Sequence, residues 1–329
     1  MEVAAGLPPK PGGQRGGTAE LTPGPTSPRI FVAQNTEDAK RKVAAQARLY
    51  SDAKVLLNAR LALIAALALA SAVSALLVSD GARTVVGAGG GVLLLIFSFV
   101  GANIEKRRRS LAVAVQEEFD TGIFRLPWNS IELNRPSPVI ITKAAARYGG
   151  GREKDWYSDT EGTHRPFDVL ICQSSNLGWG ATTHRIWAWI LSAFLAVLTG
   201  LVVLVAVNLD LSRNDILVAL VVPSLAFLKE VIEQIRTNFE TAREKEATEA
   251  KISTAWAEGM SLKQIPTEET LRLIQNKILS FRQRNPYVPD WLDKKLHARN
   301  ESAMQATAAD RVAEAVRCGH GDPTQTQEH

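Results

Sequence analysis

The stretch IWAWILSAFLAVLTGLVVLVAVNL, residues 186–209, contains twenty-four consecutive residues without a charged side chain. At a rise of about 1.5 Å per residue, a helix of this length reaches about 36 Å, more than the roughly 30 Å hydrocarbon core of a bilayer. Arg185 and Asp210 bound the stretch. Trp187 and Trp189 lie just inside the Arg185 end, where aromatic rings prefer the headgroup level. A buried helix of a soluble protein is the alternative, but such helices rarely stay uncharged for so long, and the stretch therefore predicts a transmembrane helix.

The overall composition, by contrast, resembles that of a soluble protein. The chain has 329 residues, a net charge of +4 and a mean hydropathy near zero. This average is misleading because the apolar residues are concentrated in four blocks, with most charged residues between or beyond them. The small net charge and the lack of Lys/Arg runs interleaved with aromatic residues argue against a nucleic-acid partner. The two cysteines, Cys172 and Cys318, imply no disulfide framework and are compatible with a thiol-reducing compartment.

Two uncharged blocks nearer the N-terminus predict a helical hairpin at 61–104. The first block covers 61–79 and the second 84–104, and only the turn DGAR separates them. Two spans joined by four residues must run antiparallel. Within the second block, Gly87 and Gly91 have the Gly-x-x-x-Gly spacing that allows close helix packing in lipid. Simple flexibility of a glycine-rich span explains these glycines equally well.

The fourth block, 216–228, is shorter and has Pro223 near its middle. Its length alone would suggest a buried or re-entrant helix. If it did not cross, however, the charged last hundred residues would lie on the far side of the membrane, with Lys229 directly beside the bilayer. We therefore expect a short, kinked span that starts near Leu211 and completes a second hairpin at 186–228.

Basic residues flank the blocks in a pattern that sets the orientation of the chain. The run KRRR at 106–109 directly follows the second block, and Arg185 precedes the third. The two connecting turns, by contrast, contain only Arg83 and Arg213 as basic residues. Because basic residues accumulate on the cytoplasmic side of a membrane, both termini and the segment between the hairpins should be cytoplasmic.

The sequence thus predicts an all-α membrane protein, with four transmembrane helices as two hairpins, cytoplasmic helical extensions and a helical middle segment. Gly122 is expected to end the helix that follows the second span, and Gly178 and Gly180 to loosen the approach to the third. From about Asn300 the chain is polar and alanine-rich, which indicates a marginal helix or disorder. The expected segments are a disordered Pro/Gly-rich leader (1–34), an amphipathic helix (35–60), the first hairpin (61–104), the cytoplasmic middle segment (105–185), the second hairpin (186–228), a cytoplasmic helical region (229–300) and a polar tail (301–329).

No motif in the chain predicts catalysis, a cofactor or a metal site. His164, Asp168 and Cys172 lie within nine residues, but their spacing matches no metal-binding or nucleophile motif. The glycines at 149–151 follow a predicted helix and lack the Gly-Lys-Ser/Thr end of a phosphate loop. The four uncharged blocks contain no ionisable residue, which argues against an ion-coupled transporter.

The chain resembles the SMODS-associated four-transmembrane family, whose bacterial members are thought to act as pore-forming effectors. The resemblance covers roughly residues 35–300. It is based on the two hairpins, DWYS at 155–158, LICQSSNL at 170–177 with Trp179 two places on, Pro223, Lys229 and Glu230 around the fourth span, and PYVPDW at 286–291. At Gly180 the resemblance would lead us to expect an acidic residue, so a polar contact made there by relatives does not carry over.

The resemblance implies a function in bacterial antiphage defence by abortive infection. A nucleotidyltransferase would make a nucleotide signal, and the membrane protein would then permeabilise the inner (cytoplasmic) membrane. Four helices cannot enclose a wide pore, so a homo-oligomer in the lipid bilayer is expected. The polar side chains available to line its lumen are Ser71, Ser74, Ser98, Thr199, Asn208 and Ser224.

Several residues become candidates for coupling the signal to the membrane, although helix packing is the alternative for each. Two other functions stay open: a non-conducting scaffold that recruits a cytoplasmic partner through helices around 232–281, and a membrane-bound enzyme in 105–185. The gating or coupling candidates are Asp155, Trp156, Tyr157, Cys172, Gln173, Asn176, Trp179, Lys229 and Glu230, and the packing candidates are Gly87, Gly91 and Pro223.

Overall fold

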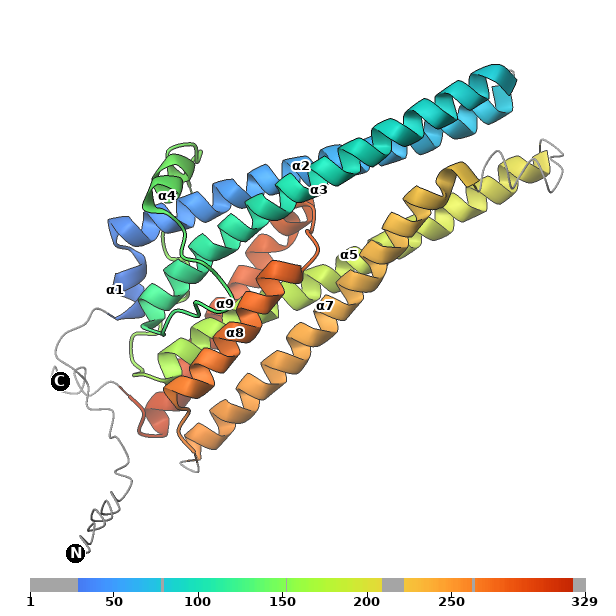
Figure 1. Cartoon of the computed structure of the whole chain (residues 1–329). Helices are drawn as coiled ribbons and strands as arrows, with labels where there is room; N and C mark the ends of the chain where they lie inside the picture. The colour runs from blue at the N-terminus through green and yellow to red at the C-terminus, as the bar shows by residue number, and fades with distance from the viewer. Residues whose placement is uncertain (1–28, 78–79, 152, 209–221, 262–263, 322–329) are drawn as a thin grey trace, which may run out of the picture.

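Where the structure describes them, the uncharged blocks and the charged segments beside them form long helices. The computed structural model describes residues 29–77, 80–151, 153–208, 222–261 and 264–321, and within these ranges every regular element is a helix. This confirms the predicted all-α class. The helices are α1 (Ile30–Gln34), α2 (Glu37–Leu77), α3 (Asp80–Phe124), α4 (Pro138–Ala145), α5 (Phe167–Asn208), α7 (Val222–Met260), α8 (Glu268–Arg284) and α9 (Asp290–Arg317) (Figure 1).

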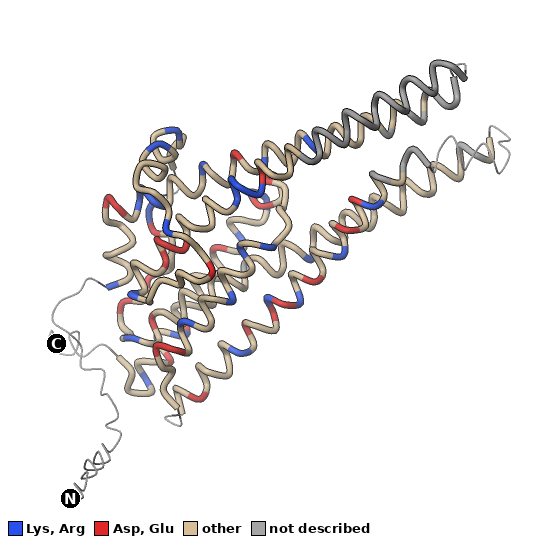
Figure 2. Tube along the Cα trace, viewed as in Figure 1, with Lys and Arg blue, Asp and Glu red and all other residues tan. Residues whose placement is uncertain are grey.

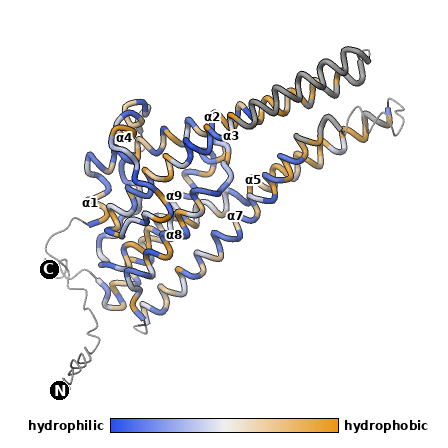
Figure 3. Tube along the Cα trace, in the orientation of Figure 1, coloured by the Kyte–Doolittle hydropathy of each residue, from blue (hydrophilic) through white to orange (hydrophobic). Residues whose placement is uncertain are grey.

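Four of these helices form two arms that extend in the same general direction from a helical bundle (Figure 1). In the first arm α2 packs against α3, and in the second α5 packs against α7. The bundle consists of α1, α4, α8, α9 and the inner ends of the four long helices. Figure 2 shows most of the charged residues in the bundle, and Figure 3 shows the described outer part of α5 as predominantly hydrophobic. The described parts of the predicted hairpin segments lie in these two arms.

The second arm contains the segment best suited to cross a membrane. Among the described residues, one helical segment, Phe167–Leu204, is long and apolar enough to span a bilayer, and 6% of its most apolar window is buried. Val197 and Val207 are 72% and 73% exposed. A core helix of a soluble protein would bury such side chains, so this surface fits contact with lipid. The other three spans stay predictions, and the start of the fourth block lies outside the described residues.

Helix α3 continues past Gly122, where the sequence led us to expect its end. Ile123 and Phe124 are 7% and 0% exposed in the apolar core, and this packing extends the helix beyond the glycine. Arg125 then adopts a φ of 51°, and the Leu126 amide donates to the Thr121 carbonyl at 3.0 Å. This bond and the left-handed residue before it form a Schellman-type helix end.

Helix α5 also runs unbroken through Gly178 and Gly180, so the expectation that these glycines loosen the chain is wrong. Both allow α7 to approach closely instead. A Cβ atom at Gly180 would lie 1.9 Å from the Lys245 Nζ atom, and one at Gly178 would lie 3.4 Å from the Glu249 Oε1 atom. Lys245 thus occupies the space beside Gly180, where the resemblance had suggested an acidic residue.

The ends of the described chain are more ordered than the sequence suggested. Ile30–Gln34 forms α1 within the expected leader, and Gln34 is 1% exposed. Helix α9 continues through the expected polar tail as far as Arg317. Ala308 and Ala315 are 2% and 0% exposed, because small side chains let this helix pack closely in the bundle, where it contacts α5. Residues 1–28 lie outside the described part of the chain.

The residues Pro-Thr-Glu-Glu at 266–269 predict a helix start, and helix α8 begins there. The side chain of Thr267 caps it by accepting a hydrogen bond from the Thr270 amide at 3.2 Å, and Glu268 and Glu269 occupy its first turn. Leu271, Ile278 and Phe281 are 0–3% exposed, so its apolar stripe faces the core. This placement brings α8 against α3 and α5 at once, at the base of both arms.

Candidate functional site

A cluster of charged and amide side chains lies buried between α3 and α8, and we call it the polar core. Its members are Glu117 and Asp120 of α3 and Arg272, Gln275 and Arg282 of α8. Arg272 Nη2 lies 2.7 Å from Glu117 Oε1, and Arg282 Nη2 lies 2.6 Å from Asp120 Oδ2. Gln275 Nε2 donates to Glu117 Oε2 at 2.9 Å and to Asp120 Oδ2 at 3.0 Å. Each carboxylate therefore has both a guanidinium and an amide partner.

Burial dominates the electrostatics of the polar core. Glu117 and Asp120 are 1% and 0% exposed. Burial raises the pKa of the Glu117 carboxyl, and Arg282 opposes this effect. Burial would lower the pKa of Arg282, but Asp120, Tyr157 and Glu117 outweigh it and raise that pKa. Charges buried this deeply are retained only where they are paired and hydrogen-bonded, so the cluster is sensitive to the loss of any member.

Side chains of α5 and of the DWYS segment hydrogen-bond to α8 and to the polar core. The Tyr157 hydroxyl donates to Asp120 Oδ1 at 2.8 Å and accepts a hydrogen bond from Asn176 Nδ2 at 2.7 Å. Asn176 Oδ1 accepts from Arg282 Nη2 at 3.2 Å, and Gln173 Nε2 donates to the Leu271 carbonyl at 2.9 Å. One hydrogen-bonded network therefore links the first arm, the second arm and α8.

The DWYS segment is also fixed to the N-terminal helix. The Gln34 side chain accepts from the Tyr157 amide at 2.7 Å and donates to the Tyr157 carbonyl at 3.0 Å. Asn35 Nδ2 donates to Asp155 Oδ1 at 2.8 Å, and Trp156 packs edge-on against Phe119 with ring centroids 6.3 Å apart. These contacts hold Tyr157 against the polar core.

The structure brings some predicted coupling residues together and separates others. Tyr157, Gln173 and Asn176 meet at the polar core, whereas Asp155 and Trp156 lie at its edge. Cys172 is 1% exposed, and burial raises the pKa of its thiol well above the ordinary value, which suits packing rather than nucleophilic chemistry.

The remaining predicted residues lie elsewhere. Glu230 reaches Arg60 at 3.4 Å near the base of the arms, and its neighbour Lys229 is exposed. Gly87 and Gly91 lie in α3 and Pro223 in the first turn of α7. Their surroundings, like the side chain of Trp179, lie outside the described part of the structure.

The charged members of the polar core were not predicted from the sequence, although a local signal existed. Glu117 and Asp120 are three residues apart and so share a helix face. Gln275 and Arg282 lie on the face of α8 that also contains the apolar Leu271 and Ile278. Charged residues on an otherwise apolar stripe indicate buried pairing, but the sequence does not say which partners meet.

A second feature lies where the two arms leave the bundle. The turn between α8 and α9 and the first residues of α9, residues 285–291, lie between the arms, and we call them the wedge. Arg109 of α3 donates to the Tyr287 hydroxyl at 3.1 Å and to the Asn285 carbonyl at 2.9 Å, and its guanidinium lies 4.1 Å from the Tyr287 ring centroid. Lys54 of α2 pairs with Asp290. The wedge is therefore bound to the first arm through both of its helices.

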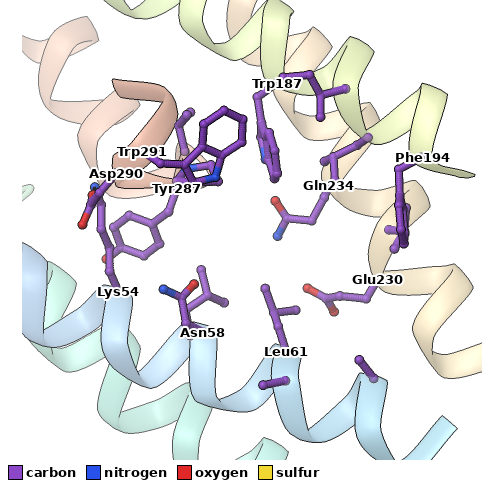
Figure 4. A pocket seen from close by; sticks show the side chains of 18 of the residues that line it. Lys54, Asn58, Leu61, Trp187, Phe194, Glu230, Gln234, Tyr287, Asp290 and Trp291 are labelled. Carbon is purple, nitrogen blue, oxygen red and sulfur yellow. Dashed lines mark hydrogen bonds and ion pairs between the residues drawn. The ribbon is translucent and has the colours of Figure 1, made fainter. Parts of the chain in front are cut away.

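The wedge contacts the second arm through aromatic rings. Trp291 packs against Trp187 of α5 with centroids 6.2 Å apart and an interplanar angle of 79°. Beside this pair lies a cavity of about 590 Å³, which we call the inter-arm cavity. Figure 4 shows Asn58 and Leu61 entering it from one side and Gln234 from the other. Helices α2, α5 and α7 and the wedge all contribute to its walls.

The described residues present no candidate metal centre: no group of three or more His, Cys, Asp or Glu side chains among them could hold an ion. His164, Asp168 and Cys172, which lie close together in the sequence, do not form such a group. His164 packs on His320, with ring centroids 5.9 Å apart, and burial raises the pKa of Asp168.

Two helical arms on a charged bundle, joined through a buried polar network, define an all-helical protein in the part of the chain that the structure describes, with one segment there apolar enough to span a membrane. More specifically, the chain belongs to the SMODS-associating 4TM effector domain family, whose model matches residues 28–311. A curated relative from Bacillus cereus (strain VD146), described as a "Probable CBASS effector molecule", is 26% identical over 199 residues. The match covers 58% of this chain and 64% of the relative, less than two thirds of its length. No solved structure matches the chain.

Proposed function

We propose that this protein is a multi-pass effector of the bacterial inner membrane that permeabilises the membrane in antiphage defence, in response to a nucleotide signal. The family and the name of the Bacillus cereus relative support an effector role. The nucleotide, made by an associated nucleotidyltransferase, would act on the cytoplasmic bundle. Cell death after permeabilisation would then stop phage replication.

The four uncharged blocks cross the membrane as two hairpins in this proposal. Both arms extend the same way from the bundle, as expected if the bundle stays on one side of the bilayer (Figure 1). The basic run KRRR at 106–109 lies where α3 passes from the uncharged part of the first arm into the bundle. This position supports a cytoplasmic bundle and cytoplasmic termini. Reporter fusions after residue 228 that turned up in the periplasm would contradict this topology.

The network at the polar core is the single observation that best supports signal transmission. It binds α3 of the first arm and α5 of the second to the same side chains of α8. A ligand that moved α8 would disturb paired charges in both arms at once. Because packed and paired interfaces tend to have discrete arrangements, such a disturbance could switch the arms between two states.

A conducting path requires several copies of the chain. Each arm has only two helices, and the outer part of α5 is exposed on most sides. Thr199 and Asn208, two of the polar residues predicted for a lumen, are exposed and hydrogen-bond to carbonyls of their own helix at 2.8 Å. They would contribute to a polar surface only when neighbouring subunits pack beside them.

Membrane potential tests the proposal. Cells that express this chain with an active nucleotidyltransferase of the same system should depolarise, whereas cells with a catalytically inactive transferase should not. Arg282→Ala should abolish depolarisation, and Arg284→Ala, a matched change to an exposed arginine on the same helix, should preserve it. Membrane fractions should contain both variants. Unchanged polarisation under every activating condition would refute pore formation.

A non-conducting scaffold remains the competing function, and the structure makes it less attractive. The apolar stripe of α8 that could have recruited a partner is buried, with Leu271, Ile278 and Phe281 in the core. Recovery of one stoichiometric partner together with flat conductance in reconstituted bilayers would favour the scaffold.

A further inference from the structure

The inter-arm cavity changes character along its length. On α2 its lining passes from Lys54 and Asn58 to Leu61 and Ala65, and Ala65 lies within the uncharged block. On α7 the lining changes in the same direction, from the polar Gln234 and Glu230 to the apolar Phe227. The cavity therefore has a polar end beside the bundle and an apolar end beside the arms.

The polar end has charges of both signs. Among the residues that line the cavity, Lys54 is the one basic residue, and Glu230 and Asp290 are the acidic ones, which gives a formal charge of −1. Lys54 pairs with Asp290, and the ion pair that Glu230 forms among the described residues is a long one, 3.4 Å to Arg60. This environment suits a zwitterion, whose ammonium group can approach Glu230, better than a polyanion such as a nucleotide.

The apolar end is lined by residues that cannot bind a headgroup. Leu61, Ala65, Phe194 and Phe227 surround it, with the Phe194 and Phe227 rings 6.4 Å apart. The total volume of about 590 Å³ falls within the roughly 300–1,000 Å³ typical of small-molecule sites. Since the cavity lies at the boundary between the charged bundle and the uncharged arms, a membrane lipid could enter it from the bilayer.

From these observations we infer that the inter-arm cavity binds one phospholipid with an ammonium-bearing, zwitterionic headgroup, as in phosphatidylethanolamine. The inference rests on the proposed membrane location. The ammonium group lies at Glu230, the phosphate near Lys54, and one acyl chain between Leu61 and the Phe194–Phe227 pair. Bound in this way, the lipid fills the space between the arms and holds the wedge against both of them.

Native mass spectrometry of the full chain, released from nanodiscs of equal phosphatidylethanolamine and phosphatidylglycerol content, tests this inference. The wild type should retain one lipid with a preference for phosphatidylethanolamine. Glu230→Gln should reduce that preference roughly fivefold, the upper range for a partly exposed charge pair. Glu233→Gln, an exposed glutamate on the same helix that pairs with Arg236, should leave the preference unchanged.

A second variant tests the apolar end separately. Ala65→Trp should displace the lipid without removing a charge. Soluble glycerophosphoethanolamine, which has the headgroup but no acyl chains, should not compete with the bound lipid. Equal retention of both lipids by the wild type, the same preference in Glu230→Gln, or retention by Ala65→Trp would overturn the inference. So would displacement of the lipid by a nucleotide.

The outcomes also separate this inference from the proposed function. If the protein enters nanodiscs and depolarises cells but binds lipids without selectivity, the lipid site alone is refuted. If the protein is fully soluble without detergent or nanodiscs, the membrane location fails, and the lipid site fails with it.

Discussion

The polar core and the inter-arm cavity both contain charged residues, but they differ in how those charges are satisfied. In the polar core, Glu117 and Asp120 are nearly inaccessible and have several short contacts each. In the inter-arm cavity, Glu230 lines open space, and its ion pair within the described part of the chain is long, at 3.4 Å to Arg60. Charged side chains that are fully paired hold their helices in one arrangement, whereas a charged side chain that is incompletely paired can bind a ligand. The polar core therefore joins α3 and α8, whereas the inter-arm cavity between α2, α5 and α7 leaves room for a ligand.

Breaking the polar core should have the largest effect. Arg282→Ala leaves Asp120 buried without its guanidinium, and we expect a loss of about 3–5 kcal/mol in the free energy of unfolding. Arg284→Ala removes an exposed arginine whose pair with Glu244 spans 3.5 Å, and should cost less than about 1 kcal/mol. Thermal unfolding in detergent measures both. Similar losses in the two variants would mean that the buried network does not stabilise the bundle.

Lys245 should make stability increase with pH. Burial and, secondly, Arg282 lower its pKa from 10.5 to about 8. Above pH 8 the unfolded chain therefore binds more protons than the folded one, and the free energy of unfolding should rise by about 2 kcal/mol between pH 7 and 9.5. Lys245→Met should lack this rise. An identical pH profile in both proteins would show that Lys245 is not buried beside Gly180.

Tyr157→Phe removes one hydroxyl from the polar core while the ring stays in place. Asp120 loses a donor at 2.8 Å and Asn176 loses an acceptor at 2.7 Å. We expect the free energy of unfolding to fall by about 1–2 kcal/mol. Tyr148→Phe, at the end of the α4 region, serves as a control and should have little effect. Denaturant titrations provide the measurement, and an unchanged midpoint for Tyr157→Phe would contradict the network.

Glu230→Gln should have the smallest effect on stability. Its pair with Arg60 is long and partly exposed, so the free energy of unfolding should change by less than about 1 kcal/mol. The same variant is expected to alter lipid preference, which sets the cavity apart from the polar core. If Glu230→Gln instead destabilised the protein as strongly as Arg282→Ala, the two regions would not differ as we describe.

The sequence predicted the arms because their signal is local. A stretch of about twenty residues without charge can be recognised from neighbouring positions alone, and 186–209 is such a stretch. The capped start of α8 at Thr267 was recognisable for the same reason. Tyr157, Gln173 and Asn176 entered as candidates through the family resemblance, and the structure places all three at one network.

The polar core itself could not be predicted because its pairs join distant parts of the chain. Glu117 and Arg272 are separated by 155 residues, and no feature of either segment specifies the other. The two glycines of α5 were misinterpreted because a glycine within a helix can indicate a loose chain or a close approach. Only the position of Lys245 against Gly180 distinguishes these possibilities.

The unbroken length of α3 has a mechanical consequence. Between Asp80 and Asp120 the helix extends about 60 Å, at about 1.5 Å per residue. With Asp120 fixed in the bundle, a tilt of about 5° at that end would displace the opposite end by about 5 Å, as a lever does. A rearrangement of a few tenths of an ångström among paired side chains could therefore become a movement comparable to half the diameter of a helix at the outer end of the arm.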